Sequence, residues 1–124
     1  MKNIVCLIAL LFCGKVYAHE MTPTYPEFRR SFIDGIHITT VRLFNRRTDV
    51  EYYEIGVFDS QWKPLTFATE SRIIKLEYLK KKTIDVYVRN KDLYDVSYIC
   101  TKSKILEGAE PTSMVSSKIC SKVK

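Results

Sequence analysis

The cysteine and histidine side chains have the widest scope for chemistry in this chain of 124 residues, which contains four cysteines and two histidines. Cys6 and Cys13 lie in an N-terminal segment that has the pattern of a signal peptide and would be lost with it. Cys100 and Cys120 remain, an even pair in a chain bound for an oxidising compartment. A zinc site needs about four ligands and a catalytic thiol needs an activating neighbour, and the sequence offers neither. It therefore predicts a structural disulfide between Cys100 and Cys120.

The two histidines, His19 and His37, raise the alternative of a copper site. Cleavage after Ala18 would make His19 the mature N-terminus, with an α-amine and an imidazole on one residue. In copper proteins with a histidine brace, these two groups and a second imidazole bind the ion on a β-sandwich, and planar nitrogen ligands suit Cu(II). His37 could be the second imidazole, although in Ile36-His37-Ile38 it also fits a polar residue that faces outward from a strand.

Motifs for other chemistry are missing from the sequence. It has no G-x-S-x-G, no glycine-rich phosphate loop and no H-E-x-x-H, and it contains four glycines in all. Its one basic cluster, Lys80-Lys81-Lys82, stands beside Thr83 and is typical of a solvated hairpin turn. The net charge of +6 is spread along the chain, without a nucleic-acid-binding motif. We therefore expect no catalysis, no cofactor and no nucleic-acid partner.

The first eighteen residues resemble a secretory signal peptide. Met1-Lys2-Asn3 is a short positive region, an apolar run follows from Ile4 to Phe12, and Val16-Tyr17-Ala18 has small residues at the two positions that signal peptidase reads. The run is shorter than the roughly 20 residues that span a bilayer, so we expect no membrane span after cleavage. The sequence thus predicts an exported protein, periplasmic or secreted, whose mature chain begins at His19.

The elements that must position these groups are organised around the stretch from Ile36 to Asp59. Apolar and polar residues alternate with a period of two in both of its halves, which indicates β-strands and fits helical spacing poorly. Between the halves, Asn45-Arg46-Arg47-Thr48-Asp49 is a polar, charged turn. The stretch therefore predicts two β-strands joined by that turn.

Short strands separated by turn residues continue through the rest of the chain, which is typical of an antiparallel sandwich or a small barrel. We predict that residues 36–104 form an antiparallel β-sandwich with at least six strands. The domain would run from residue 19 to residue 106, and residues 107–124 would be a C-terminal tail tied back by the disulfide. The predicted core residues are Val41, Leu43, Ile55, Val57, Ile84, Val86 and Val88.

A family resemblance rests on the strand Val41-Arg42-Leu43-Phe44-Asn45, which reads apolar-x-apolar-x-Asn before a polar turn and a second alternating strand. It resembles the N-terminal immunoglobulin-like domain of periplasmic pilus-assembly chaperones. The opening Met21-Thr22-Pro23 and the strand Thr83–Arg89 are similar too, so the likeness covers roughly residues 21–105. It implies an all-β, immunoglobulin-like antiparallel β-sandwich after a cleaved signal peptide. The likeness does not extend to the family's second domain, and we expect a tail with a cysteine at that place in this sequence.

The resemblance also implies where a partner would bind. In that family a basic pair anchors the terminal carboxylate of a pilus subunit, while an alternating strand completes the subunit's fold. Arg29 or Arg30 matches the first basic position, and Lys102 or Lys104 matches the second.

The predicted function is that of an exported, non-catalytic binding or assembly module. It would act like a chaperone and pair with a protein partner, such as a pilus-like or surface subunit, through a sheet edge. We predict Val96–Cys100 as that edge, with main-chain hydrogen bonds giving affinity and side chains such as Val96 and Tyr98 giving specificity. A small copper-binding β-sandwich that uses His19 and His37 is the alternative.

Overall fold

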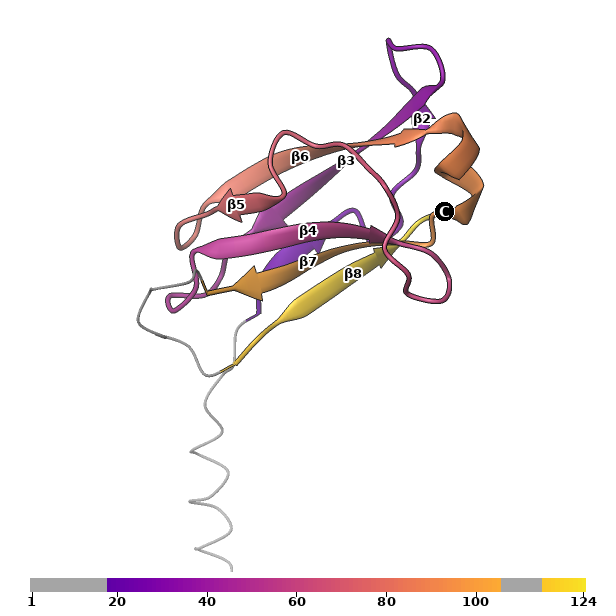
Figure 1. Ribbon diagram of the computed structural model, residues 1–124. Helices are drawn as coiled ribbons and strands as arrows, with labels where there is room; N and C mark the ends of the chain where they lie inside the picture. The colour runs from indigo at the N-terminus through magenta and orange to yellow at the C-terminus, as the bar shows by residue number, and fades with distance from the viewer. Residues whose placement is uncertain (1–17, 106–114) are drawn as a thin grey trace, which may run out of the picture.

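The computed structural model describes residues 18–105 and 115–124, which form two antiparallel β-sheets packed face to face (Figure 1). The predicted all-β antiparallel sandwich is confirmed. The predicted signal peptide lies outside the described residues except for Ala18, and so does the first part of the predicted tail. The elements are β1 (Glu20–Thr22), β2 (Arg29–Arg30), β3 (Ile36–Phe44), β4 (Tyr52–Phe58), β5 (Ile73–Lys75), β6 (Lys81–Arg89), a 3-10 helix η1 (Asn90–Asp95), β7 (Tyr98–Lys104) and β8 (Lys118–Lys122).

The first sheet is built on β3, which pairs with β6 along its whole length, from Ile36 opposite Arg89 to Phe44 opposite Lys81. On its other side β3 pairs with β2 near its start and with β1 near its end. Alternate side chains of β3 and β6 are buried, as the two-residue period of a strand requires.

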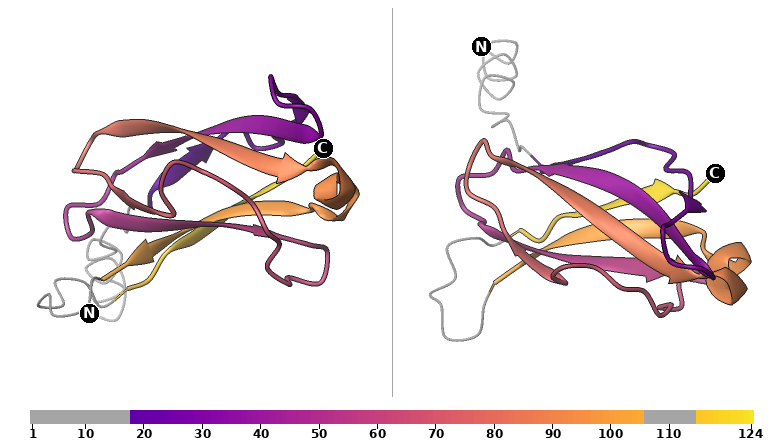
Figure 2. Two further views of the ribbon diagram at one scale, coloured as in Figure 1. Left: turned by 45° about the horizontal axis from the view of Figure 1, so that its top comes forward. Right: turned by 90° about the horizontal axis from the view of Figure 1, so that it is seen from above.

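The second sheet has the strand order β5-β4-β7-β8. Figure 2 shows β3 and β6 lying over β4, β7 and β8, with the core between the two layers. Each large apolar side chain removed from water there contributes roughly 1.5–3 kcal/mol to stability. All seven predicted core residues are buried, which confirms them: Val41, Leu43, Ile55, Val57, Ile84, Val86 and Val88.

The prediction of at least six strands within residues 36–104 is wrong, because this range contains five strands, β3 to β7, and the helix η1. Residues 64–68 make only isolated bridges, Phe58 to Pro64 and Ala68 to Tyr87. Pro64 has no N–H to donate, so a ladder cannot continue through it on both sides.

The prediction that residues 107–124 form a tail is wrong for Lys118–Lys122, because these residues form strand β8 of the second sheet. It pairs with β7 from Tyr98 opposite Lys122 to Lys102 opposite Lys118. The two sulfur atoms of Cys100 and Cys120 are 2.08 Å apart, which confirms the predicted disulfide. It joins directly opposite residues of β7 and β8 and fixes the register between these strands.

Replacing both Cys100 and Cys120 with alanine should lower the free energy of unfolding by 2 to 3 kcal/mol. The bond closes a loop with a sequence separation of 20 residues, and restricting such a loop in the unfolded chain is worth about 3 kcal/mol. Urea unfolding of the oxidised protein and the double variant measures the difference. A variant as stable as the oxidised protein would contradict this expectation.

Candidate functional site

The strand predicted as the free edge lies inside the second sheet. Strand β7 bonds to β4 on one side and to β8 on the other. Val96, just before β7, is 8% exposed and packs in the core. The prediction that Val96–Cys100 is an open edge is therefore wrong, because the segment taken for a tail supplies its second neighbour.

The predicted basic residues are not brought together. Arg29 and Arg30 lie in β2 opposite the beginning of β3, at the end of the sandwich where η1 lies. Lys104 ends β7 opposite Tyr52, at the other end of the sandwich (Figure 1). Lys102 lies two residues earlier, with an exposed side chain on the outer face of the second sheet. One partner carboxylate cannot contact both pairs.

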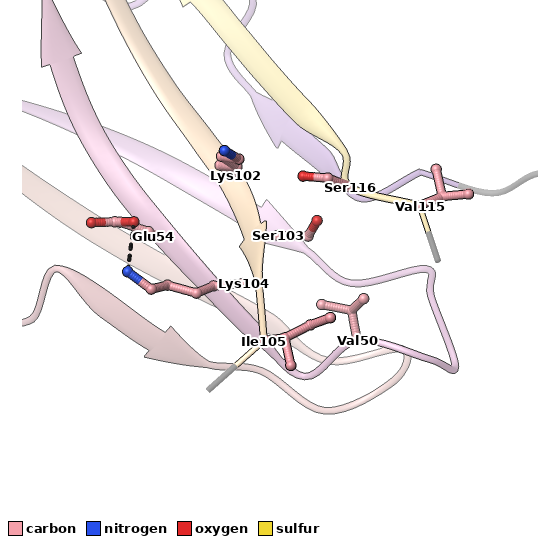
Figure 3. A pocket seen from close by; sticks show the side chains of 8 residues that line it. All are labelled: Val50, Glu54, Lys102, Ser103, Lys104, Ile105, Val115 and Ser116. Carbon is pink, nitrogen blue, oxygen red and sulfur yellow. Dashed lines mark hydrogen bonds and ion pairs between the residues drawn. The ribbon is translucent and has the colours of Figure 1, made fainter. Parts of the chain in front are cut away.

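A cavity of about 350 Å³ opens beside Lys104 (Figure 3). Glu54 is the one acidic residue among the described residues that line it, and its Oε2 atom lies 3.0 Å from Lys104 Nζ. The other described lining side chains are apolar, hydroxyl or lysine. Residues 18–105 and 115–124 therefore supply no pair of carboxylates here for acid–base chemistry.

The histidines of the copper hypothesis lie at opposite ends of β3. His19 immediately precedes Glu20, which pairs with Phe44 at the end of β3, whereas His37 is the second residue of that strand. Seven residues of strand separate the two positions by roughly 23 Å. The structure therefore contradicts a copper site shared by His19 and His37. Among residues 18–105 and 115–124, no three His, Cys, Asp or Glu side chains gather as metal ligands would.

A buried polar network, which sequence reasoning missed, surrounds Asn45. This side chain is fully buried, and its amide group donates to the carbonyl oxygens of Val50 at 2.7 Å and Leu76 at 2.8 Å. Its Oδ1 atom accepts the hydroxyl of Tyr53 at 2.6 Å and the backbone N–H of Arg47 at 2.8 Å. Asn45 thus satisfies four groups and ties the turn after β3 to β4 and to the strand connection beyond β5.

His19 extends this network across the sandwich. Its Nδ1 atom lies 2.9 Å from Ser117 Oγ and its Nε2 atom 2.9 Å from Thr101 Oγ1, while its ring lies 4.6 Å from that of Tyr53. The side chain is 1% exposed, and burial lowers the pKa of His19 to about 4. Burial also raises the pKa of the Tyr53 hydroxyl to about 12. The His19 and Tyr53 side chains are therefore neutral at pH 7, and both are buried away from solvent.

Arg47 completes the network from the polar turn predicted between β3 and β4. Its guanidinium donates twice to the Asp49 carboxylate, at 2.9 and 2.7 Å, and once to Ser117 Oγ at 3.2 Å. The hydrogen bonds to Asp49 raise the pKa of Arg47, so the charge is kept although the side chain is 5% exposed. The turn is thus polar as predicted, but two of its side chains, Asn45 and Arg47, are buried.

The free backbone groups of the fold lie along the outer edge of β6. The hydrogen bonds from the N–H of Asn45 to the carbonyl of Lys80 and from the N–H of Asn90 to the carbonyl of Gly35 fix the alternation of the β3–β6 ladder. Even-numbered residues of β6 bond to β3, and odd-numbered residues point their N–H and C=O groups away from it. Tyr87 bonds there to Ala68; in the described part of the chain, the outward backbone groups of Lys81, Thr83 and Asp85 meet no backbone partner.

The other edges are shorter, since β5 and β1 have three residues each, β2 has two and β8 has five. The edge of β8 lies close to β1, and the N–H of Lys124 just after it donates to the carbonyl of Pro26. Strand β6 has nine residues, and the part of its outer edge without a described backbone partner runs from Lys81 to Asp85. A cavity of about 130 Å³ separates this part of β6 from the segment that leads into β5.

The hairpin between β2 and β3 carries a separate exposed feature. Phe32 is completely exposed and Ile33 is 62% exposed, although hydrogen bonds from Ser31 to Ile33 and Ile36 order the turn. This tip is distant from the β6 edge at Lys81, because β6 begins at the far end of β3.

The fold and these surfaces define the class of protein: a small antiparallel β-sandwich with a buried polar network and an edge strand, β6, that is partly unpaired. A comparison with protein-family models finds no match to this chain, and a search of curated proteins finds none either. Within the described residues, no helix has the length and apolar character needed to cross a membrane. The surfaces of the molecule are therefore the basis for inferring the function of this protein.

Proposed function

We propose that this protein is an exported, non-catalytic binding module that captures an extended segment of a protein partner along the edge of β6. The observation that carries the proposal is the row of outward N–H and C=O groups at Lys81, Thr83 and Asp85. An added strand would pair with these groups, and its alternate side chains would provide specificity. Charged residues along the same edge, Lys81 and Asp85, protect it from indiscriminate pairing.

The basic cluster at the start of β6 supports a partner with a carboxylate. Lys81 Nζ lies 5.2 Å from the centre of the Phe44 ring, and Lys82 Nζ is 3.7 Å from a Glu70 carboxylate that is itself 84% exposed. The ammonium groups of Lys81 and Lys82 remain accessible to solvent in spite of these contacts. A terminal carboxylate or acidic residue of the added strand can therefore form a charge-assisted hydrogen bond with Lys80, Lys81 or Lys82.

Export and the lack of catalysis form part of the same proposal. The Cys100–Cys120 disulfide is typical of the periplasm or the extracellular space, and the predicted signal peptide points the same way. The strongly perturbed ionisable groups, His19 and Tyr53, are sealed in the core rather than arranged around a cleft. The proposal keeps the strand-pairing role that the resemblance to pilus chaperones implies, and it moves that role from β7 to β6.

Thr83→Pro should abolish partner capture and leave the fold intact. The N–H of Thr83 points away from β3, so proline removes a donor only from the free edge. The probe is a panel of nine-residue alternating peptides, each made with a free C-terminal carboxylate or an amide, with binding followed by fluorescence anisotropy. We expect at least a tenfold loss of affinity, with an unchanged circular dichroism spectrum.

The matched control is Lys122→Pro, which places proline at an outward N–H on the edge of β8. It should leave peptide binding unchanged. Equal losses in both variants, equal binding by Thr83→Pro and the parent protein, or no peptide bound at millimolar concentration would each contradict the proposal.

A further inference from the structure

An aromatic platform lies on the outer face of the second sheet, far from the edge of β6. Trp62, in the loop after β4, stacks on Tyr98 of β7 with ring centres 4.2 Å apart and planes 6° apart. Phe58 of β4 lies beside them, with its ring centre 6.4 Å from that of Trp62. Trp62 is nevertheless 50% exposed, so much of the indole remains open to solvent.

The loop holds Trp62 in one place. Asp59 Oδ1 accepts the backbone N–H groups of Gln61 at 2.8 Å and Lys63 at 2.9 Å. The backbone of Asp59 bonds in addition to Lys63 O and to the N–H of Trp62. Trp62 has a φ of 64°, a left-handed conformation that a bulky residue seldom adopts without such support. The indole is therefore presented in advance of any ligand.

One cation lies against the platform, and two more line a cavity beside it. Lys118 Nζ lies 5.0 Å from the centre of the Phe58 ring and 5.1 Å from that of Trp62. Lys118, Lys102 and Arg72 line an adjoining cavity of about 370 Å³. The one carboxylate in its lining, that of Glu54, is paired with Lys104 at 3.0 Å.

The floor of this cavity is fixed by small residues. A Cβ atom on Gly56 would lie 2.9 Å from the Phe58 ring, so glycine is what lets the ring lie over the strand. Cys100 of β7 lies opposite Gly56 of β4 and is bonded to Cys120 of β8. This disulfide holds β8, which carries Lys118, beside β7, which carries Tyr98. The strands that carry Phe58, Tyr98 and Lys118 therefore keep their register to one another.

We infer that this face binds an acidic saccharide. The C–H groups on one face of a pyranose ring carry slight positive charge and pack on the negative face of an indole. A carboxylate or sulfate on the same sugar would then reach Lys118, with Lys102 and Arg72 available for the neighbouring unit. A neutral sugar would leave the cations unused, and an acidic peptide would leave the flat indole without a matching surface. This site is independent of the partner edge, which belongs to the other sheet.

The fluorescence of Trp62 reports binding directly, since the chain contains one tryptophan. The probes are a hexuronate oligosaccharide, a sulfated oligosaccharide, a neutral oligosaccharide of the same length and an oligoglutamate peptide. We expect a saturable change with at least one acidic oligosaccharide, at least tenfold weaker binding of the neutral one, and no saturable binding of oligoglutamate. Lys118→Gln should weaken acidic-saccharide binding at least tenfold, and calorimetry should show the same for Trp62→Ala.

The controls separate this site from other surfaces. Phe32→Ala removes an exposed aromatic ring at the β2–β3 hairpin, and Lys91→Gln removes an exposed lysine from η1, away from the platform. Both should bind the acidic saccharide as the parent protein does, and so should Thr83→Pro, which tests the β6 edge alone. Oligoglutamate binding as tight as that of the saccharides, no binding of any acidic saccharide, or full binding by Lys118→Gln would overturn the inference.

Discussion

Replacing Asn45 with alanine should lower the free energy of unfolding by about 5 kcal/mol. The change leaves the carbonyl groups of Val50 and Leu76, the hydroxyl of Tyr53 and the N–H of Arg47 without their partner. Each buried polar group left unsatisfied costs roughly 1–3 kcal/mol, and water that enters the space restores part of that loss. Urea unfolding at pH 7 measures the difference.

Two further variants calibrate this result. Asn90→Ala changes an exposed side chain at the first residue of η1, so the change in the free energy of unfolding should stay within about 0.5 kcal/mol. Tyr53→Phe removes one hydrogen bond and should cost about 1 kcal/mol, which keeps the account testable if Asn45→Ala does not fold. A loss below about 1 kcal/mol in Asn45→Ala would contradict the network described above.

The stability of the protein should fall by about 3.4 kcal/mol in total between a pH well above 6.5 and a pH well below 4, owing to His19, and most of this loss should occur between pH 6.5 and 4. Its pKa is lowered by burial to about 4 in the folded protein, against 6.5 for an unperturbed histidine. Between these values the unfolded chain binds a proton that the folded chain does not, so unfolding is favoured by about 1.36 kcal/mol per pH unit. The full contribution is present above pH 6.5, and the loss is complete below pH 4.

Urea unfolding at half-unit intervals of pH measures this effect. His19→Gln should lose the slope between pH 4 and 6.5, because glutamine does not titrate, although its stability at pH 7 will be lower. Asn90→Ala, which changes no ionisable group, is the control and should keep the slope of the parent protein. An equal slope in His19→Gln and the parent would show that other groups account for the pH dependence.

The core and the two long strands could be predicted because their pattern is local. Val41 and Leu43, like Ile84, Val86 and Val88, alternate with polar residues over enough positions to fix which face is buried. The disulfide followed from cysteine number and compartment alone. Neither inference needed to know which strands are neighbours.

Strand β8 escaped prediction because it has little apolar pattern of its own. Among its five residues Ile119 is the one partly buried apolar side chain of the core, and the strand exists through pairing with β7 and the bond to Cys100. Since that pairing was not predicted, Val96–Cys100 was predicted as the edge and no edge was predicted in β6.

The buried network and the aromatic platform depend on contacts between distant residues. His19 contacts Ser117, which lies 98 positions later in the sequence. Trp62 stacks on Tyr98, and β5, β6 and η1 lie between these two residues in the sequence. Asn45 did stand out in the apolar-x-apolar-x-Asn strand, but its burial follows from Tyr53 and from the backbone of Leu76. A polar residue with such partners is indistinguishable in sequence from one in an exposed turn.

Amide hydrogen exchange along β6 is the most direct test that this edge takes up a partner strand. In the free protein, Ile84, Val86 and Val88 should exchange slowly, because they bond to β3, whereas Thr83 and Asp85 should exchange almost as fast as an unstructured chain. Addition of a peptide selected from the panel should slow Thr83 and Asp85 at least a hundredfold and leave Lys118 and Lys122 of β8 unchanged. Slow exchange of Thr83 and Asp85 in the free protein, or unchanged exchange with the peptide bound, would contradict the account.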